Sequence, residues 1–255
     1  MSSGVRVYKL GGPALEDAEL LPALAEELRR ARGRVLVVHG GGRHVERELK
    51  ARGLQSRFVG GRRETSAEAM EVVEMVLSGI VNKGLAAGLT AAGLPAIGLS
   101  GRDAGLLRAR VEPGLGRVGR PESVDARVLE AAWGAGLVPV VSPVSQGVDG
   151  GALNVNADEA ALAVAVALRA DTLVYLSDVD GVRLDAHPVA SLSADEVRHH
   201  VAQGAITGGM AMKVDTALQA VAAGVPEVIV AGKARLVGGF PGTRLHLGAA
   251  EGARA

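Results

Sequence analysis

The fold of this chain is decided by stretches such as RVLVVHGGGRHVERELK, residues 34–50, in which a short apolar run ends in three glycines and a helix-forming segment follows. Continuous runs of Val and Leu are typical of strands that are buried on both faces of a sheet. The same order of strand, glycine turn and helix recurs along the chain. Strands that alternate with helices predict an α/β fold with a mainly parallel central sheet.

This pattern places the expected elements along the chain. Strands are expected over residues 5–10, 34–39, 96–99, 138–142, 172–177 and 227–231. Helices are expected over residues 15–31, 67–77, 197–202 and 212–223. Two pairs have the spacing of a capping box at a helix start, Thr65 with Glu68 and Ser193 with Glu196. The polar segment 102–125 is expected to form hairpins or loops, and a soft boundary between two lobes is expected after Val144.

Composition excludes several classes of protein. A chain of 255 residues can bury a large core, and 48% of it is apolar while only 2% is aromatic. The 28 basic residues balance the 28 acidic ones, which gives no reason to expect nucleic acid or an anionic membrane as a partner. The absence of cysteine excludes disulfides and thiolate metal sites. The first residues lack a signal-peptide core, and the longest apolar run, residues 160–168, is too short to span a bilayer, so a cytoplasmic protein is expected.

The turns after the predicted strands are the first candidates for a site, because ligands of such sheets bind at the carboxyl ends of the strands. Lys9 lies in an otherwise apolar strand, where it either meets an anionic group or extends to the surface. Three glycines, Gly40 to Gly42, exceed the needs of a tight turn and expose successive N–H groups that suit a carboxylate or phosphate. No Walker A, G-x-G-x-x-G or zinc-binding histidine pattern occurs, which argues against a P-loop enzyme, a standard dehydrogenase and a zinc enzyme.

The segment NVNAD, residues 154–158, introduces an alanine-rich helix with polar residues at every second position. Asn156 is a good N-cap, and Glu159 follows three residues later as in a capping box. This local role leaves Asn154 unexplained, although it lies on the same face as Asn156 if the chain is extended. It also leaves Asp158 in the first turn unexplained. The three polar groups together predict a cluster that faces a ligand.

Two later segments also have both a local and a functional interpretation. The first, YLSDVDGV at residues 175–182, ends a buried strand in polar residues and by itself fits an ordinary Asp-Gly turn. The second, ITGGMAMKV at residues 206–214, places two glycines shortly before Lys213. This lysine is either an exposed helical residue or one that reaches a ligand enclosed by the glycine backbone.

The segments VYKLGG, VVHGGG, GLSGRD, LNVNADEAA, YLSDVDGV, ITGGMAMKV and GTRL occur in the order seen in the amino acid kinase family, which this chain resembles over about residues 5–247. Each motif is short, but seven of them in order with suitable spacing make the match strong. The resemblance implies a three-layer αβα sandwich with a mainly parallel central sheet, as a single amino acid kinase domain over residues 1–255. Within it, lobe 1–144 is expected to bind the acyl amino acid and lobe 145–255 to bind ATP.

The resemblance also implies roles for individual residues. Lys9 and Lys213 are expected to stabilise the transferred phosphoryl group, with Asp158 holding both lysines in place. The acyl amino acid is expected to contact Gly41, Gly42, Arg63 and Asn154. The nucleotide is expected to contact Gly11, Gly12, Ser177, Asp178, Val179, Asp180, Gly181, Val182, Arg183, Gly208, Gly209 and Met210. No residue is assigned to a metal, and Mg²⁺ is expected to neutralise the β- and γ-phosphates of ATP.

Within the family, the motifs are most similar to those of members that phosphorylate the γ-carboxylate of N-acetyl-L-glutamate in arginine biosynthesis. That reaction needs positioning and charge stabilisation more than covalent chemistry. A carboxylate acceptor is already ionised at pH 7, so no general base is required. This agrees with the absence of any histidine among the expected catalytic residues.

One departure from the family pattern keeps a sister activity open. The segment GGRRETS, residues 60–66, has Arg62 and Glu64 where apolar residues are expected. Further arginines cluster nearby in sequence, namely Arg57, Arg108, Arg110, Arg117 and Arg120. They are compatible with a kinase of lysine biosynthesis that acts on α-aminoadipate attached to an acidic carrier protein. A non-catalytic amino-acid or nucleotide sensor is the other alternative, against which the retained lysines argue.

The resemblance extends to assembly. Family members that arginine inhibits carry an additional amino-terminal helix, for which the eight residues before Lys9 leave no room. A homodimer that is insensitive to arginine is therefore expected. Met70, Val73, Val76 and Leu77 form an apolar stripe on helix 67–77. Burial of part of this stripe in the core is one alternative, but in the family the corresponding helix helps to form a two-fold contact, and the dimer contact is expected there. Whether a regulator of the PII type binds stays open.

Overall fold

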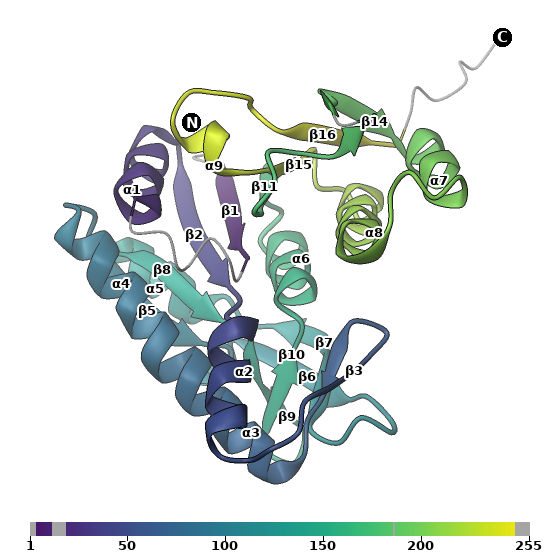
Figure 1. Ribbon diagram of the computed structural model, residues 1–255. Coiled ribbons are helices and arrows are strands. Elements are labelled where there is room, and N and C mark those ends of the chain that lie inside the picture. Colours follow the sequence, from purple (N-terminus) through teal and green to yellow (C-terminus); the bar gives the residue numbers. More distant parts are fainter. Residues whose placement is uncertain (1–3, 12–18, 186, 248–255) are drawn as a thin grey trace, which may run out of the picture.

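The computed structural model describes residues 4–11, 19–185 and 187–247. Its central sheet has eight strands in the order β14-β16-β15-β11-β1-β2-β8-β5 (Figure 1). These strands are β14 Ser191–Ser193, β16 Thr243–His246, β15 Glu227–Ala231, β11 Thr172–Leu176, β1 Val5–Leu10, β2 Arg34–His39, β8 Val138–Ser142 and β5 Ala96–Ser100. All neighbours pair in parallel except β15 and β16, so the predicted mainly parallel sheet is confirmed.

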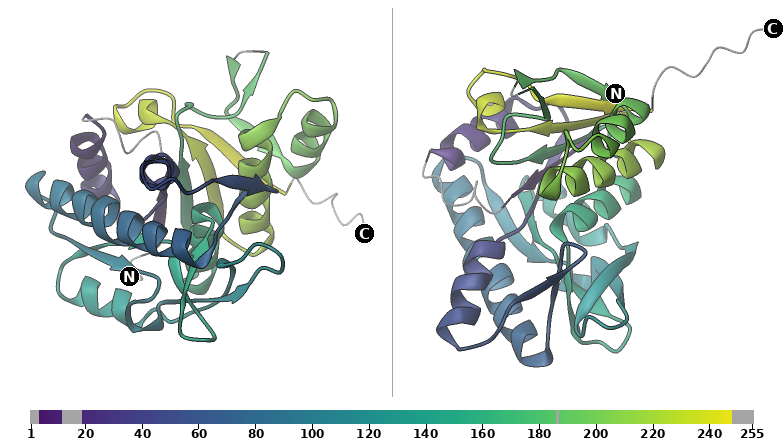
Figure 2. Two further views of the ribbon diagram at one scale, coloured as in Figure 1. Left: turned by 60° about the horizontal axis from the view of Figure 1, so that its bottom comes forward. Right: turned by 45° about the vertical axis from the view of Figure 1, so that its right-hand side comes forward.

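The helices cover both faces of this sheet, as the alternation of strands and helices predicts. They are α1 Leu20–Arg30, α2 Gly42–Ala51, α3 Ala67–Glu74, α4 Asn82–Ala91, α5 Arg127–Gly134, α6 Ala157–Ala167, α7 Ala194–Ala202, α8 Gly208–Ala222 and α9 Lys233–Leu236. One buried core lies under α5, α6, α7 and α8, and a second lies under α1, α2, α3, α4 and α9. The two cores on opposite faces confirm the three-layer αβα sandwich, which Figure 2 shows from two further sides.

Side-chain caps begin three of the helices. The capping box of Ser193 and Glu196 is present at the start of α7, and the amide oxygen of Asn156 accepts from the N–H of Asp158 at the start of α6. The predicted cap of α3 is wrong by one residue, because Ser66 and not Thr65 accepts from the N–H of Ala69. Helix α1 begins at Leu20, and the part of its predicted range at residues 15–18 lies outside the described residues.

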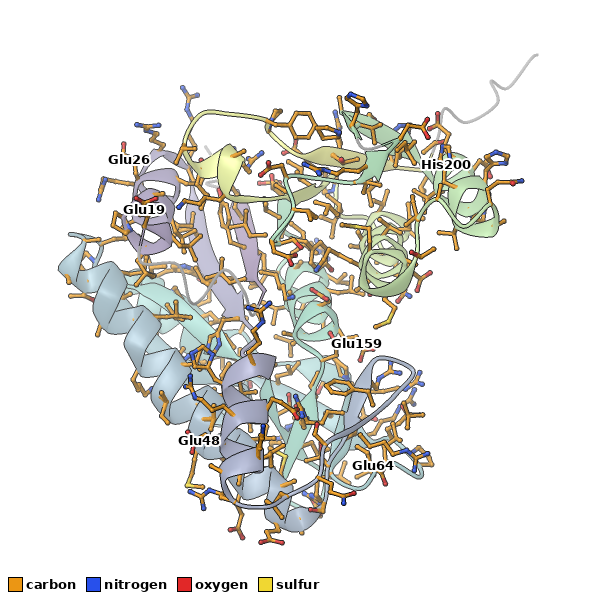
Figure 3. The ribbon with its side chains drawn as sticks, in the orientation of Figure 1. Glu19, Glu26, Glu48, Glu64, Glu159 and His200 are labelled. Atoms are coloured by element: carbon orange, nitrogen blue, oxygen red, sulfur yellow. The ribbon has the colours of Figure 1, made fainter. Side chains whose placement is uncertain are left out.

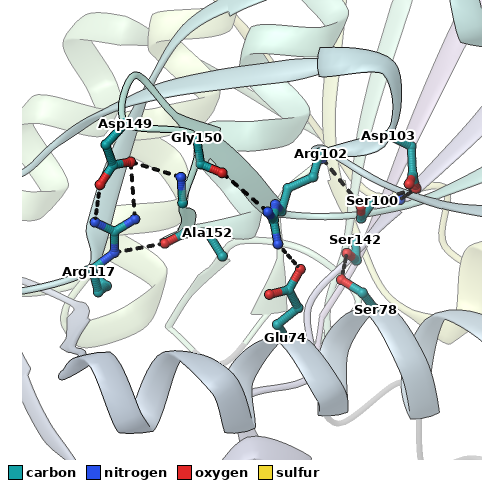
Figure 4. Close-up of polar contacts among 11 residues, drawn as sticks. Glu74, Ser78, Ser100, Arg102, Asp103, Arg117, Ser142, Asp149, Gly150 and Ala152 are labelled. Atoms are coloured by element: carbon teal, nitrogen blue, oxygen red, sulfur yellow. Dashed lines mark hydrogen bonds and ion pairs between the residues drawn. The ribbon is translucent and has the colours of Figure 1, made fainter.

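The segment 102–125, expected as hairpins or loops, contains an antiparallel hairpin that belongs to a second small sheet. In it, β6 Leu107–Val111, β7 Val118–Val124, β9 Val144–Gly147 and β10 Ala152–Val155 close on themselves. Arg117 holds the β9–β10 turn, because its guanidinium contacts the Asp149 carboxylate at 2.7 Å and donates to the Ala152 carbonyl at 3.0 Å (Figure 4). Arg102 ties the same turn to Glu74 of α3. Two short hairpins complete the structure, β3 Arg57–Val59 with β4 Arg62–Glu64 and β12 Arg183–Leu184 with β13 His187–Pro188.

The helix from Ala67 to Ala91 is continuous through a π-helical segment, η2 Met75–Val81, between α3 and α4. By length and composition it is apolar enough to cross a membrane, but half of its most apolar window is buried inside the protein, as in the core helix of a globular domain. Met70, Val73, Val76 and Leu77 are all buried in this core. The apolar stripe that was expected to form a dimer contact therefore stabilises the single chain instead.

Candidate functional site

The candidate site is a cavity of about 220 Å³ at the carboxyl ends of β1 and β2 and the start of α6. It is lined by Lys9, Gly40, Gly41, Gly42, Val45, Phe58, Gly61, Arg62, Arg63, Val73, Leu77, Val118, Pro143, Asn154, Val155, Asn156, Ala157 and Asp158. Six of the residues predicted from the sequence are thus brought to one place from four separate segments. The position agrees with the rule that ligands of parallel sheets bind beyond the carboxyl ends of the strands.

Asp158 lies between two lysines that come from different elements. Its carboxylate is 2.7 Å from the Nζ of Lys9, at the end of β1, and 3.8 Å from the Nζ of Lys213 on α8. Burial opposes ionisation of Asp158, but the two ammonium groups outweigh it and hold the pKa of this carboxyl below its usual range. Burial, together with the charge of Lys9, lowers the pKa of Lys213. The triad is therefore a buried cluster with one net positive charge, suited to an anion.

The start of α6 explains two of the three polar residues of NVNAD, Asn156 and Asp158. Asn156 caps the helix, as predicted, and directs Asp158 toward the lysines. Tyr175 lies beneath, with its hydroxyl 3.4 Å from the Asp158 carbonyl. The carboxylate of Glu159 does not complete a capping box with Asn156, because it pairs with Arg62 of β4.

The glycine turn after β2 approaches the site closely. The N–H of Gly40 donates to the Leu10 carbonyl at 2.9 Å, which joins the ends of β1 and β2. Gly41 has a φ of 152°, and a Cβ there would lie 2.7 Å from Leu77 and 3.3 Å from Val81 of η2. Glycine is therefore required at this position. Gly42 opens α2, so the amino-terminal end of this helix borders the cavity.

Arg63 is a buried arginine whose side chain is 7% exposed. Its guanidinium donates to the Glu46 carboxylate, to the Ser56 hydroxyl and, at 3.2 Å, to the Gly42 carbonyl. It also lies 4.6 Å from the centre of the Phe58 ring. Hydrogen bonds from Arg63 and Ser56 lower the pKa of Glu46. These contacts fix the arginine at the wall of the cavity.

Asn154 faces the same cavity from β10. Its amide donates to the Thr65 hydroxyl at 3.0 Å, and that hydroxyl donates to the Arg63 carbonyl at 2.6 Å. The buried Thr65, expected as a helix cap, is thus a link between Arg63 and Asn154. This link connects the two residues that were assigned to the substrate.

The described residues assigned to the nucleotide lie outside the lining of this cavity. The turn from Ser177 to Val182 follows β11, where Asp180 accepts from the N–H of Ala234 and the charge of Asp178 acts on Lys213. The N–H of Gly11 donates to the Leu176 carbonyl at 3.0 Å, so it is used within the structure. The remaining assigned positions are the buried Val182, Arg183 of β12, and Gly208, Gly209 and Met210 at the start of α8. Gly12 lies outside the described residues.

Arg62, interpreted from the sequence as a departure from the family pattern, belongs to the site. Its side chain is only 20% exposed and pairs with Glu159. Three other members of the predicted arginine cluster are paired within the chain, Arg57 with Glu64, Arg117 with Asp149 and Arg120 with Glu112. The cluster is therefore not a continuous patch of unpaired positive charge.

His39 and Asn82 form a buried pair beneath the glycine turn that was not predicted from the sequence. Both side chains are fully buried. The His39 Nδ1–H donates to the Gly40 carbonyl at 2.7 Å, and the Nε2 accepts from the Asn82 amide at 3.1 Å. The same amide nitrogen lies within hydrogen-bond distance of the carbonyls of Leu99 and Val140, so it connects the ends of β2, β5 and β8. No periodicity in the sequence distinguishes Asn82 from a surface residue of a helix.

The chain is similar to known proteins over most of its length. The model of the amino acid kinase family matches residues 4–232. The acetylglutamate kinase of Rubrobacter xylanophilus is 47% identical to this chain, covering 93% of it and 95% of the relative, and that of Deinococcus radiodurans is 49% identical, covering 88% and 91%. A Streptococcus mutans structure superimposes with a TM-score of 0.85 at 26% identity, over 97% of this chain and all of the other. The chain belongs to the amino acid kinase family.

Proposed function

We propose that this chain transfers the γ-phosphoryl group of ATP to the γ-carboxylate of N-acetyl-L-glutamate, giving N-acetyl-L-glutamyl 5-phosphate for arginine biosynthesis. The observation that carries the proposal is the Lys9–Asp158–Lys213 triad beside a cavity that also holds Arg63 and Asn154. The similarity to acetylglutamate kinases over most of the chain supports the choice of substrate.

The two lysines supply the charge that phosphoryl transfer requires. Negative charge develops on the equatorial oxygens of the transferred group, and fixed cations in a site with little water stabilise it strongly. Asp158 holds both ammonium groups, so little reorganisation is needed during transfer. The acceptor carboxylate is ionised at neutral pH and attacks directly, without a general base.

The other end of the cavity holds the amino-acid part of the substrate. Arg63 provides a buried guanidinium for the α-carboxylate of the substrate. The same guanidinium also binds the carboxylate of Glu46, whose side chain is exposed. Asn154 keeps its amide oxygen for the N-acetyl portion while its nitrogen binds Thr65. Gly41 and Gly42 let the backbone come close to the acceptor. Residues 1–144 thus provide most of the acyl amino acid pocket, and Asn154 completes it.

The nucleotide is assigned to residues 145–255, on the turn from Ser177 to Arg183 and the start of α8 at Gly208 to Met210. The N–H of Gly11 is already bonded to the Leu176 carbonyl, so this residue does not donate to the phosphates of ATP. Gly11 instead lets the phosphates approach because it has no side chain. No cluster of three metal-ligating side chains occurs within residues 4–11, 19–185 and 187–247. Mg²⁺ is commonly held by substrate phosphates and water with few protein ligands, so it is proposed to arrive with ATP.

Trapping the acyl phosphate with hydroxylamine tests the activity. The purified chain with ATP, Mg²⁺ and N-acetylglutamate is expected to yield the hydroxamate and one ADP per hydroxamate. Lys213→Ala, tested in parallel, is expected to lose nearly all of this yield. Wild-type chain that forms no hydroxamate would contradict the kinase and favour a sensor. A yield only with carrier-linked α-aminoadipate would assign the sister activity, which the internally paired arginines do not favour.

We further propose that the protein is a cytoplasmic homodimer. Met75 and Ile80, 47% and 60% exposed, lie on the outer face of the helix from Ala67 to Ala91 and provide apolar surface for a two-fold contact. Light scattering that gives the mass of one chain would contradict this assembly and leave the kinase proposal unaffected. A PII-type regulator is a separate question, for which binding of a purified regulator is the direct test.

A further inference from the structure

The β3–β4 hairpin, residues 57–64, is joined to the second half of the chain by an ion pair. Arg62 of β4 contacts the carboxylate of Glu159 in the first turn of α6, and the two side chains are 20% and 24% exposed. Glu159 lies between α6 and the hairpin in Figure 3. The pair is therefore largely shielded from solvent, where an ion pair is screened less than at the surface.

A second contact joins the same hairpin to α8. Gly61 has a φ of 75°, and a Cβ at this residue would lie 1.9 Å from the terminal methyl of Met212. Glycine suits this positive φ, and its lack of a side chain leaves room for Met212 against the hairpin backbone. The two contacts have a common feature, because Glu159 follows Asp158 in sequence and Met212 precedes Lys213.

Arg62 and Arg63 are neighbours on β4 but point to opposite sides, as successive residues of a strand do. Arg63 binds Glu46 and the start of α2, and Arg62 binds α6. Arg62 lines both the candidate site and an adjoining cavity of about 450 Å³, which Arg110, Arg120 and Asp215 also line. Its Nε is buried and has no hydrogen-bond partner among the described residues.

We propose that Arg62 is a positioning residue. Its ion pair with Glu159 fixes the distance between the acyl amino acid, which Arg63 binds, and the two lysines that Asp158 holds. The inference rests on the proposed function for its catalytic consequence. The hairpin carries Arg63, while α6 and α8 carry Asp158 and Lys213. A displacement between these parts changes the distance between the acceptor carboxylate and the phosphoryl group. Errors of about 1 Å in such alignments reduce turnover by up to roughly a hundredfold.

Neutral variants of similar size test the pair without introducing a new charge. Arg62→Met and Glu159→Gln are each expected to lower kcat by roughly ten- to a hundredfold, with the KM for ATP nearly unchanged. Because the two groups act as a unit, the double variant is expected to lose no more than either single variant. Arg62→Lys is expected to restore part of the turnover. The matched control is Arg57→Met, which removes a 3.6 Å ion pair on the same hairpin whose arginine side chain is 75% exposed.

Amide hydrogen exchange of residues 57–65 provides a readout that is independent of activity. Exchange is expected to be faster in Arg62→Met and in Glu159→Gln than in the wild type, and unchanged in Arg57→Met. If the wild type is active, two results would overturn the inference. One is a wild-type kcat in Glu159→Gln, and the other is a loss of kcat in the double variant equal to the product of the two single losses. If the wild type forms no acyl phosphate, the proposed function fails, and the exchange measurement alone tests whether the Arg62–Glu159 pair holds the hairpin in place. Equal exchange rates in the wild type and all three single variants would show that it does not.

Discussion

Acid is expected to destabilise this protein through one buried imidazole, that of His39. Burial is the main cause that lowers its pKa from 6.5 to about 4. The hydrogen bond to Gly40 raises this pKa, and the charge of Lys83 lowers it further. The unfolded chain therefore binds more protons than the folded one between these two pH values. Stability from a neutral His39 is fully present above pH 6.5 and is lost as the pH falls toward 4.

The size of the effect follows from the shift. The difference between a pKa of 6.5 in the unfolded chain and about 4 in the folded one corresponds to roughly 3 kcal/mol when titration is complete, and to about 2 kcal/mol between pH 8 and pH 5. Urea unfolding at these two pH values measures it. His39→Gln is expected to be less stable than the wild type at pH 8, but its further loss on going to pH 5 is expected to be smaller by about 2 kcal/mol.

His199→Gln is the matched control, because His199 is exposed on α7. It is expected to lose as much stability between pH 8 and pH 5 as the wild type does. Acidic residues titrate in all three proteins alike, so the difference between their losses isolates the imidazole. Equal losses in His39→Gln and the wild type would refute the argument that burial keeps His39 neutral.

The remaining predictions concern the site itself. Lys213→Ala is expected to lower kcat roughly a hundredfold or more while the KM for ATP changes little, which steady-state kinetics would show; near-normal turnover would exclude its assigned role. Arg63→Ala is expected to raise the KM for N-acetylglutamate roughly tenfold or more, and Arg63→Lys is expected to recover only part of it, because one ammonium cannot replace a guanidinium fork. Gly41→Ala is expected to lower the free energy of unfolding by about 1–3 kcal/mol, whereas Gly42→Ala, with no atom within 4 Å of its Cβ, serves as the control in thermal denaturation. Removal of Mg²⁺ with EDTA is expected to abolish hydroxamate formation but to leave binding of N-acetylglutamate measurable by calorimetry.

Local patterns in the sequence were sufficient for six of the eight strands of the central sheet, but not for β14 and β16 on one side of it. The strands β1, β2 and β8 lie at the predicted residues, because a continuous apolar run between glycine turns has few alternatives to a buried parallel strand. The order of the motifs pointed to Lys9, Asp158 and Lys213 in the sequence, and the structure brings these three side chains together at the edge where the parallel strands end.

Pairing across long sequence separations was decided only by the tertiary structure. The polar segment 102–125 was expected as hairpins or loops, and β6 and β7 do form an antiparallel hairpin. Its closure into a small sheet with β9 and β10 could not be predicted from the polar pattern of the two strands. The stripe on helix 67–77 had no sequence feature to separate a core face from a dimer face, and packing against the sheet buries it. Arg62 stood out in the sequence only as a departure from the family pattern, and folding brings its partner Glu159, 97 residues away, to its side. The role of a charged residue on a strand depends on its partner, and the partner of Arg62 is brought near only by the tertiary structure.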